Sequence, residues 1–451
     1  MKIPESSPRF QDLFAKITQK GTDLLYKLYA VDLKDDRYFS YADTKYRPVP
    51  PEISAIGGGR EEWWFRIISE RNSKFQKLPF SSLNGENFQF FTDNSDLQLI
   101  HNIDLNGGGT LGIHGMLPNE NERNKYFISS LIDEAFYSSF IEGAVSTREI
   151  AKKMIAEKRE PRDKSERMIL NNYNTMQLLD SWKAEPLSSE LICRIHSHIS
   201  ETTLPPEKLG RYRTADDSNI VLSDDRGNVY HTPCDYKAID DKIRELCDFA
   251  NVNADGRNFI HPIIKGIILH FMLAYIHPFF DGNGRTSRAL FYWYLLKNNY
   301  WAVKFISISR VIMESGNRYY MSFLDTEQGC NDLNFFIKFQ LEAIDRAIRS
   351  FGDYVARRKA EMRELSQNME TLNDLNDRQK AIALKIIRKP FENAEFTIDS
   401  HRGLNAISFE TARQDLLDMQ KREILSRRKS GRAYVFYPSK DFLAKIESKN
   451  Q

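Results

Sequence analysis

Apolar side chains recur every three to four positions along much of the chain, which is the spacing of a helix with one buried face. The stretch 125–142 has this pattern, with apolar residues at Phe127, Leu131, Ile132, Ala135, Phe136 and Phe140. A second stretch, 263–275, is apolar at most positions, and its helix must end before Pro278 because proline disfavours helical dihedral angles in the preceding residue. Both stretches predict a mainly α protein.

Further elements follow from periodicity and from capping residues. Residues 146–149, Ser-Thr-Arg-Glu, form a capping box at the start of one helix. Other helices are expected over 163–182, 188–200, 236–252, 287–297 and 332–365. One segment predicts a β-hairpin instead, because strand-like residues flank the turn 224–228: Asn219, Ile220, Val221 and Leu222 before it, and 229–233 after it.

The first 120 residues have a less regular pattern. Pro48, Pro50 and Pro51 interrupt it, as do two glycine triplets at 57–59 and 107–109. Aromatic runs at 63–65 and 88–91 are expected to be buried. This part predicts a mixed, mostly helical accessory region.

Residues 376–451 predict a helix, another helix and a hairpin. Asn376 caps the first helix, Ser408 begins the second, and the segments 424–425 and 434–437 pair across a turn. The order resembles a winged helix. A DNA contact would use the basic hairpin tip, although protein binding or a solvated turn also explains its residues Arg427, Arg428, Lys429 and Arg432.

Length and composition limit the number of domains, the partners and the compartment that can be expected. A chain of 451 residues is too long for one ordinary core and predicts about two to four domains. The net charge of +2 provides no global field that favours nucleic acid or membrane. No apolar run approaches the ~20 residues of a membrane span and no signal core is visible, so a cytoplasmic protein is expected. Four scattered cysteines indicate reduced, structural thiols.

The most specific stretch is 276–288, which reads Ile-His-Pro-Phe-Phe-Asp-Gly-Asn-Gly-Arg-Thr-Ser-Arg. Gly282, Asn283 and Gly284 can direct successive backbone N–H groups towards one point at the start of a helix. The positive helix N-terminus adds to this nest, and Arg285 and Arg288 add two charges. The stretch therefore suits a polyphosphate.

Two further side chains in this stretch suit chemistry on that phosphate. Asp281 would repel a phosphate directly but can hold a Mg²⁺ ion between its carboxylate and phosphate oxygens. His277 has an ordinary pKa suited to accepting a proton from a hydroxyl at neutral pH. The plainer alternative is a helix stop followed by a turn with surface ion pairs.

The stretch resembles the signature of Fic domain proteins, His-x-Phe-x-Asp/Glu-Gly-Asn-Gly-Arg-x-x-Arg, and meets every fixed position from His277 to Arg288. The resemblance implies a helical Fic fold that transfers AMP from ATP to a protein hydroxyl, with His277 as the base and Asp281 on Mg²⁺. Phe279 would pack in the core. The implied nucleotide-binding residues are Gly282, Asn283, Gly284, Arg285, Thr286, Ser287 and Arg288, the last near the γ-phosphate.

An inhibitory motif precedes the signature. The residues Ser138 to Gly143 match the family's pattern Ser/Thr-x-x-x-Glu-Gly/Asn, in which the glutamate reaches the second arginine of the signature and blocks productive ATP binding. Here the pair would be Glu142 and Arg288. An ordinary helix end capped by Gly143 is the alternative, but a glutamate there lies at the unfavourable end of the helix dipole. The motif's position implies a class II Fic protein.

Two features resemble other parts of the family's site. The predicted hairpin with Asn219, Ile220, Val221 and Leu222 resembles the Fic flap, which holds the target by strand addition. Tyr319 occupies the place where Fic proteins carry an aromatic residue near the nucleoside, although a packing role explains it as well. A hairpin that merely stabilises a loop is the alternative for the flap.

The interpretation is a protein adenylyltransferase with ATP as substrate, Mg²⁺ as cofactor and a protein with a Ser, Thr or Tyr hydroxyl as target. The expected parts are an accessory region 1–120, a Fic domain 121–350 with an inhibitory helix 125–143, a connector 351–375 and a winged-helix-like domain 376–451. Two alternatives stay open, namely removal of AMP and a nucleotide-sensing DNA-binding regulator. A homodimer is compatible with the sequence.

Overall fold

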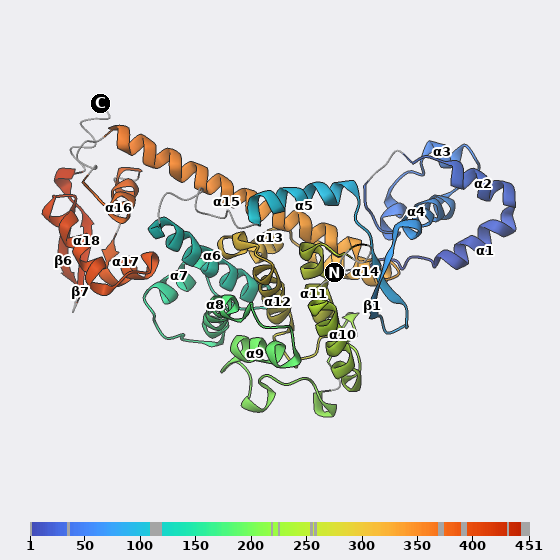
Figure 1. Ribbon diagram of the computed structural model, residues 1–451, viewed down its shortest axis with the longest axis horizontal. Helices are drawn as coiled ribbons and strands as arrows, with labels where there is room; N and C mark the ends of the chain where they lie inside the picture. The colour runs from blue at the N-terminus through green and yellow to red at the C-terminus, as the bar shows by residue number, and fades with distance from the viewer. Residues whose placement is uncertain are drawn as a thin grey trace.

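The computed structural model describes residues 2–33, 37–108, 120–217, 220–223, 226–252, 256, 259–368, 374–388, 395–430 and 433–442. These residues are mainly helical, as predicted, with small sheets of two or three strands. Three parts lie along the long axis of the molecule: N-terminal helices, a central helical core and a C-terminal domain (Figure 1).

The N-terminal part combines helices with one hairpin. Its helices are α1 (Phe10–Lys20), α2 (Thr22–Ala30), α3 (Pro51–Ser54) and α4 (Arg60–Lys74), and the chain then continues into α5 (Asn94–Gly107), which packs against α15 (Asn334–Asn368) over the central core. The aromatic run at 63–65 is buried, as predicted, among Leu13, Ile17 and Leu28. The run at 88–91 lies in and just after strand β2 (Asn87–Phe90), which pairs with β1 (Gln76–Ser81) in a hairpin that the sequence did not suggest.

The central core consists of helices around two buried ones. The surrounding helices are α6 (Glu120–Ile141), α7 (Arg148–Ala156), α8 (Lys164–Trp182), α9 (Ser189–Ser200), α10 (Ile239–Asn251), α13 (Ile308–Glu314), α14 (Arg318–Gln328) and α15 (Asn334–Asn368). Side chains of Thr147, Asp163 and Ser188 cap three of them. Helices α8 and α9 begin within one residue of the predicted positions, whereas the cap of α7 is Thr147 and not Ser146, the first residue of the predicted capping box.

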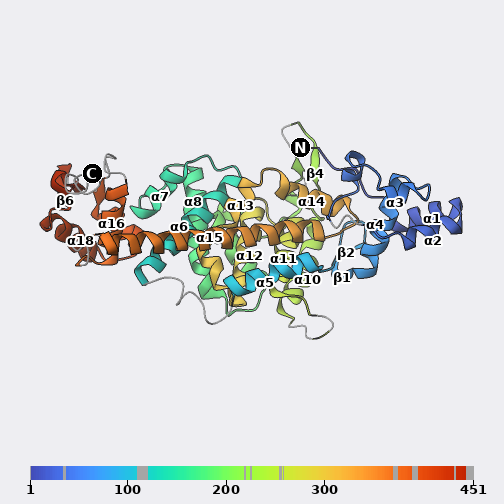
Figure 2. The same cartoon turned by 90° about the horizontal axis from the view of Figure 1, so that it is seen from above.

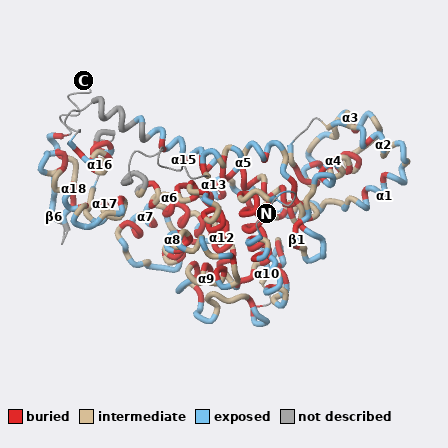
Figure 3. The backbone as a smooth tube through the Cα atoms, viewed as in Figure 1, coloured by how far each residue is buried: buried red, intermediate tan, exposed pale blue. Residues whose placement is uncertain are grey.

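The two buried helices carry the signature stretch between them. They are α11 (Pro262–Ile276) and α12 (Asn283–Lys297), and both lie in the most buried region of the molecule (Figure 3). Every residue of α11 from Ile263 to Leu273 is buried. Helices that are apolar on all sides must be surrounded by other elements. The loop between them is therefore fixed at both ends by buried helices.

The predicted flap is a short hairpin, with β3 (Leu222–Ser223) paired to β4 (Val229–His231). Ile220 and Val221 precede β3, whereas Asn219 lies outside the described residues. Leu222 faces His231 and Ser223 faces Val229 across the pair. The strands are shorter than the sequence suggested because polar residues and the glycine turn leave few side chains to pack on either face.

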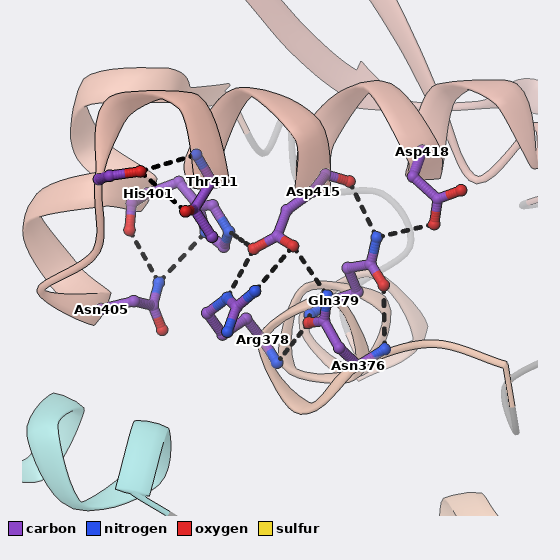
Figure 4. Close-up of polar contacts among 9 residues, drawn as sticks. Asn376, Arg378, Gln379, His401, Asn405, Thr411, Asp415 and Asp418 are labelled. Atoms are coloured by element: carbon purple, nitrogen blue, oxygen red, sulfur yellow. Dashed lines mark hydrogen bonds and ion pairs between the residues drawn. The ribbon is translucent and has the colours of Figure 1, made fainter.

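The C-terminal part contains α16 (Asp377–Arg388), α17 (Ile398–Asn405), α18 (Phe409–Lys421) and a sheet of β5 (Phe396–Thr397), β6 (Leu425–Ser430) and β7 (Ala433–Pro438) in the order β5-β7-β6. Its helices are joined by polar contacts at the buried Asp415, which accepts hydrogen bonds from Asn376, Arg378 and His401 (Figure 4). These donors hold the pKa of Asp415 well below its usual range despite its burial. A winged helix and a DNA contact through Arg427, Arg428, Lys429 and Arg432 stay predictions, and Arg432 lies outside the described residues.

The C-terminal domain rests on the central core. Helix α17 packs against α6 and α7, and α16 also reaches α6. Helix α15 extends from the core towards this domain along the length of the molecule (Figure 2). In the part of the chain that the structure describes, no helix combines the length and apolarity needed to cross a bilayer.

Candidate functional site

The signature loop begins where α11 ends at His277. His277 adopts a left-handed conformation with φ 51°, and its N–H still donates to the carbonyl of Leu273 at 3.1 Å. Arg213 binds the loop twice: its Nε donates to the carbonyl of His277 at 2.8 Å, and its backbone N–H donates to that of Pro278 at 2.8 Å. The turn at His277 is therefore fixed from outside the motif.

Asn283 closes the loop from inside. Its side-chain Oδ1 accepts from the N–H of Phe279 at 2.9 Å, and its Nδ2 donates to the carbonyl of Phe279 at 2.8 Å. Both ends of the amide are thus used, so the side chain of Asn283 holds the loop and only its backbone N–H can face a ligand. Phe279 is fully buried, as predicted.

His196 on α9 supports the same loop, a role that the sequence did not reveal. Its ring stacks on Phe279 at 3.8 Å between centroids, and its Nε2 donates to the carbonyl of Asp281 at 2.9 Å. Its Nδ1 accepts from the N–H of Gly210 at 3.1 Å, so the imidazole is neutral. Burial lowers the pKa of His196 to about 4. No local sequence pattern marks this role, because the residues that His196 contacts are distant from it in sequence.

Helix α12 begins after Gly282, whose φ of 82° allows the chain to turn into the helix. The first N–H groups of a helix have no intrahelical acceptor, and here they belong to Asn283, Gly284 and Arg285. The hydroxyls of Thr286 and Ser287 donate to the carbonyls of Gly282 and Gly284. These two side chains are fully buried, so their predicted nucleotide contact would have to use the backbone.

The two arginines of the signature are both buried. Arg285 is 1% exposed, its NH1 donates to the carbonyl of Ile199 at 3.3 Å, and its Nε has no partner among the described residues. Burial lowers the pKa of Arg285. Burial alone would also lower the pKa of Arg288, but the charge and hydrogen bond of Glu142, together with Tyr319 and Glu134, raise this pKa above its ordinary value.

Glu142 reaches the signature from the end of α6. Its Oε1 accepts from the NH2 of Arg288 at 2.9 Å, and Ser138 binds the same guanidinium through its hydroxyl and carbonyl. A Cβ added at Gly284 would lie 2.0 Å from the Oε1 of Glu142. The carboxylate therefore lies directly against the first turn of α12, where the helix N-terminus favours an anion.

Glu134 anchors the same helix and was not singled out from the sequence. It is 2% exposed, and its carboxylate accepts from the hydroxyls of Tyr292, Ser307 and Ser309 and from the N–H of Ser309. Glu134, Ser138 and Glu142 are spaced four residues apart, which places them on one helix face. That face meets α12 through Tyr292 and Arg288.

A cleft of about 540 Å³ opens beside the loop, a size typical of small-molecule sites. Its walls include His277, Gly284 and Glu142 together with Val221 and Leu222 of the flap. The cleft therefore brings part of the predicted site together, whereas Asp281, Arg285 and Arg288 do not line it. Ile220 is only partly buried and is not among the residues that line the cleft.

Two tyrosines of α14 also line the cleft. Tyr319 is 4% exposed, and its hydroxyl bonds the Nε2 of the buried His270 at 3.0 Å. Tyr320 is 42% exposed, so it presents the larger free ring surface. The nucleoside contact of Tyr319 stays a prediction, and Tyr320 is the neighbour with more surface to offer.

His277 has the electrostatic state of a base. Its Nδ1 donates to the carbonyl of Ala274 at 3.3 Å, and since a carbonyl cannot donate, Nδ1 carries the proton and Nε2 has the free lone pair. Burial and the nearby His231 lower the pKa of His277 to about 4. The imidazole is consequently neutral at physiological pH.

Asp281 is the single carboxylate of the loop. Its side chain is 46% exposed and lies 3.9 Å from the NH2 of Arg285. Among the described residues no group of three or more His, Cys, Asp or Glu side chains could hold a metal on its own. A Mg²⁺ ion shared with phosphates needs only one or two protein carboxylates, so an exposed Asp281 fits such an ion.

Comparison with known proteins supports one family. Residues 186–295 match the model of the Fic/DOC family. Protein adenylyltransferase Fic of Nematostella vectensis is 27% identical over 170 residues, covering 38% of this chain and 35% of that protein. The protein of the same name from Drosophila grimshawi is 30% identical over 97 residues, which is 22% of this chain and 18% of that protein. The chain thus matches well under half the length of these relatives.

Among solved structures, a Fic family protein from Desulfovibrio desulfuricans G20 aligns with 81% of this chain and 99% of its own, at 17% identity and a TM-score of 0.48. The matched family segment runs from the start of α9 through the flap to α12 and contains His277, Asp281 and Arg288. Residues 186–295 therefore match a Fic domain.

Proposed function

We propose that this protein is an adenylyltransferase that transfers AMP from ATP to a hydroxyl side chain of a target protein and that Glu142 restrains this activity. One observation carries the proposal: a carboxylate lies against Gly284 and Arg288, at the helix N-terminus where a polyphosphate would bind. The names of the relatives support the same reaction. The restraint would be geometric, since carboxylate and phosphate require the same guanidinium.

The chemistry balances as a substitution at the α-phosphorus. The target oxygen forms a bond to phosphorus, the bond to the β-phosphate oxygen breaks, and pyrophosphate leaves. The hydroxyl proton goes to the Nε2 of His277, the nitrogen left free by the contact with Ala274. The N–H groups at the start of α12, with Arg285 and Arg288, would bind the phosphates. Positioning supplies most of the catalysis, because ATP brings its own leaving group.

Asp281 would hold Mg²⁺ at the edge of this cradle. The ion, when bound, neutralises phosphate charge and helps pyrophosphate to leave. The unpartnered Nε of Arg285 supports an anion next to it, because a buried guanidinium N–H gains from an acceptor. The flap residues Val221 and Leu222 would face the target segment across the cleft.

The decisive experiment is intact-mass analysis of wild type, Glu142→Gly and His277→Ala after incubation with ATP and Mg²⁺. We expect a mass increase of one AMP in Glu142→Gly, much less in wild type and none in His277→Ala. His277→Ala should still bind ATP within a few fold, since the imidazole holds no phosphate. Modification of His277→Ala at the rate of Glu142→Gly would refute the mechanism.

Removal of AMP is a second candidate, favoured by the place of Glu142. Its carboxylate lines the same cleft as His277, so it could accept a proton from a water whose oxygen bonds to the phosphorus. The bond from phosphorus to the target oxygen would break, and that oxygen would receive the proton to give back the hydroxyl. Wild type mixed with labelled, self-modified Glu142→Gly protein would then release AMP. Release by a His277→Ala, Glu142→Gly double variant at the same rate would exclude this assignment.

A further inference from the structure

His231 is a buried histidine of the flap strand β4 with both ring nitrogens occupied. Its Nε2 lies 2.8 Å from the carbonyl oxygen of Tyr275, and its Nδ1 lies 2.9 Å from the Oε2 of Glu327. Its exposed fraction is 8%. Tyr275 precedes His277 by two residues on α11, and Glu327 lies at the end of α14. His231 therefore connects the flap to two helices of the core.

The partners of this ring determine its protons. A carbonyl oxygen can only accept, so Nε2 must carry a proton. A carboxylate also accepts, so an ionised Glu327 requires a second proton on Nδ1. The ring between these two acceptors is then an imidazolium, and the carboxylate compensates its charge. Charge-assisted hydrogen bonds of this kind are among the stronger ones.

The pair lies in the cleft that holds His277. His231 and Glu327 both line it, together with Tyr275 and the ring of His277. Three charged groups act on His277: His231 and Arg213 oppose its protonation, and Asp281 favours it. Of the first two, His231 has the larger effect. Arg213 donates hydrogen bonds to the carbonyls of His277 and Cys234. The positive charge of His231 on β4 depends instead on one neighbour, Glu327.

We propose that His231 is a positioning residue of this site: as an imidazolium held by Glu327, it fixes β4 against α11 and places a positive charge beside the base His277 that opposes its protonation. This inference rests on the proposed function, because it assigns His231 to the same reaction. A neutral His277 is needed at the start of transfer, when its Nε2 must accept the hydroxyl proton. The flap would then contribute to catalysis as well as to target binding.

The variant that removes the charge beside His277 is His231→Gln. Glutamine keeps a polar side chain between the carbonyl of Tyr275 and Glu327 but cannot carry a positive charge. We expect the titration midpoint of His277 to rise by about one pH unit, as for removal of a nearby like charge. Glu342→Gln is the matched control, because Glu342 is exposed and pairs with Arg318 on the surface.

The measurement is ¹⁵N NMR of protein labelled at histidine, titrated between pH 4 and 8 without nucleotide, with His231→Gln and His277→Gln used to assign the signals. Two protonated nitrogens on His231 at pH 7 in wild type and a raised His277 midpoint in His231→Gln support the inference. A singly protonated His231 in wild type, or an unchanged His277 midpoint in His231→Gln, overturns it.

A kinetic measurement links the inference to turnover. In the Glu142→Gly background, the acid limb of AMP incorporation should move to higher pH with His231→Gln and stay in place with Glu342→Gln. An acid limb that does not move, while incorporation occurs, contradicts the inference. Absence of incorporation at every pH counts against the proposed function alone, since the NMR titration reads His231 and His277 without any turnover.

Discussion

The backbone at Gly284 lies against the Glu142 carboxylate, in the place where a phosphate of ATP would also bind. The Oε1 of Glu142 lies where a Cβ at this position would be, at 2.0 Å. A side chain here would displace Glu142, yet it would also fill the space in which a phosphate would sit. Gly284→Ala is therefore expected to break the contact between Glu142 and Arg288 without any gain in AMP incorporation, and to weaken ATP binding at least about tenfold.

Isothermal titration with ATP and incorporation of labelled AMP test this variant beside Glu142→Gly. Gly352→Ala is the matched control, because a Cβ at Gly352 on α15 meets no atom within 4 Å. A Gly284→Ala protein as active as Glu142→Gly would show that phosphates do not use the first turn of α12.

His196 provides a prediction on pH and stability. Its folded-state pKa of about 4 lies below that of an unfolded histidine at about 6.5. Between these values the unfolded chain binds the proton more readily, so the free energy of unfolding falls as the pH falls from about 6.5 to 4. The loss amounts to about 1.4 kcal/mol for each unit of pKa difference.

Urea unfolding of wild type and His196→Gln at pH 7.5, 6 and 5 measures this effect. Glutamine does not titrate, so the stability difference between the two proteins should shrink towards low pH. A constant difference across the three pH values would mean that His196 is not buried in its neutral form.

At the scale of single elements, one face of helix α6 anchors it to the central core. Glu134 accepts four hydrogen bonds from Tyr292, Ser307 and Ser309, and the same face ends at Glu142. Glu134→Ala leaves these buried donors without an acceptor, at a cost of at least about 1–3 kcal/mol. We expect faster hydrogen exchange in residues 124–143 and more AMP incorporation, because Glu142 loses its fixed position.

Glu149→Ala serves as the control for α6, since Glu149 is exposed on α7. Hydrogen exchange by mass spectrometry and labelled-AMP incorporation would be followed on the same samples. Faster exchange with unchanged incorporation would show that the anchor at Glu134 does not set the position of Glu142.

At the scale of the whole molecule, the C-terminal domain lies against the helix that carries Glu142. Helix α17 packs on α6 and α7, and a Cβ at Gly403 would lie 2.2 Å from the carbonyl oxygen of Ala156 at the end of α7. Arg148 at the start of α7 forms a bidentate ion pair with Asp133 of α6. The domain thus reaches α6 directly and through α7.

Gly403→Ala should push α17 away from α7 and loosen both helices. We expect lower thermal stability and higher AMP incorporation than in wild type, whereas Gly352→Ala should match wild type in incorporation. Gly403→Ala that lowers stability but leaves incorporation unchanged would show that the C-terminal domain does not act on Glu142.

The sequence by itself determined most of the helices and predicted the local chemistry. Apolar periodicity predicted α6, α11 and most of α12, and the starts of α8 and α9 were predicted within one residue, because these signals act within a few residues. The stretch 276–288 also predicted the nest and the role of His277, since each belongs to one turn of chain. The pairing of Glu142 with Arg288 was predicted only through a family motif, and the structure brings the two side chains together.

Only the tertiary structure decided which distant side chains support the site. His196 behind Phe279, Glu134 below Tyr292 and the pair of His231 with Glu327 all join residues far apart in sequence, so no local pattern marks them. The hairpin of β1 and β2 was likewise missed, because its strands depend on packing against the core. Side-chain burial and long-range hydrogen bonds are set by the assembled core, and for that reason the ionisation of His277 could be derived only from the folded chain.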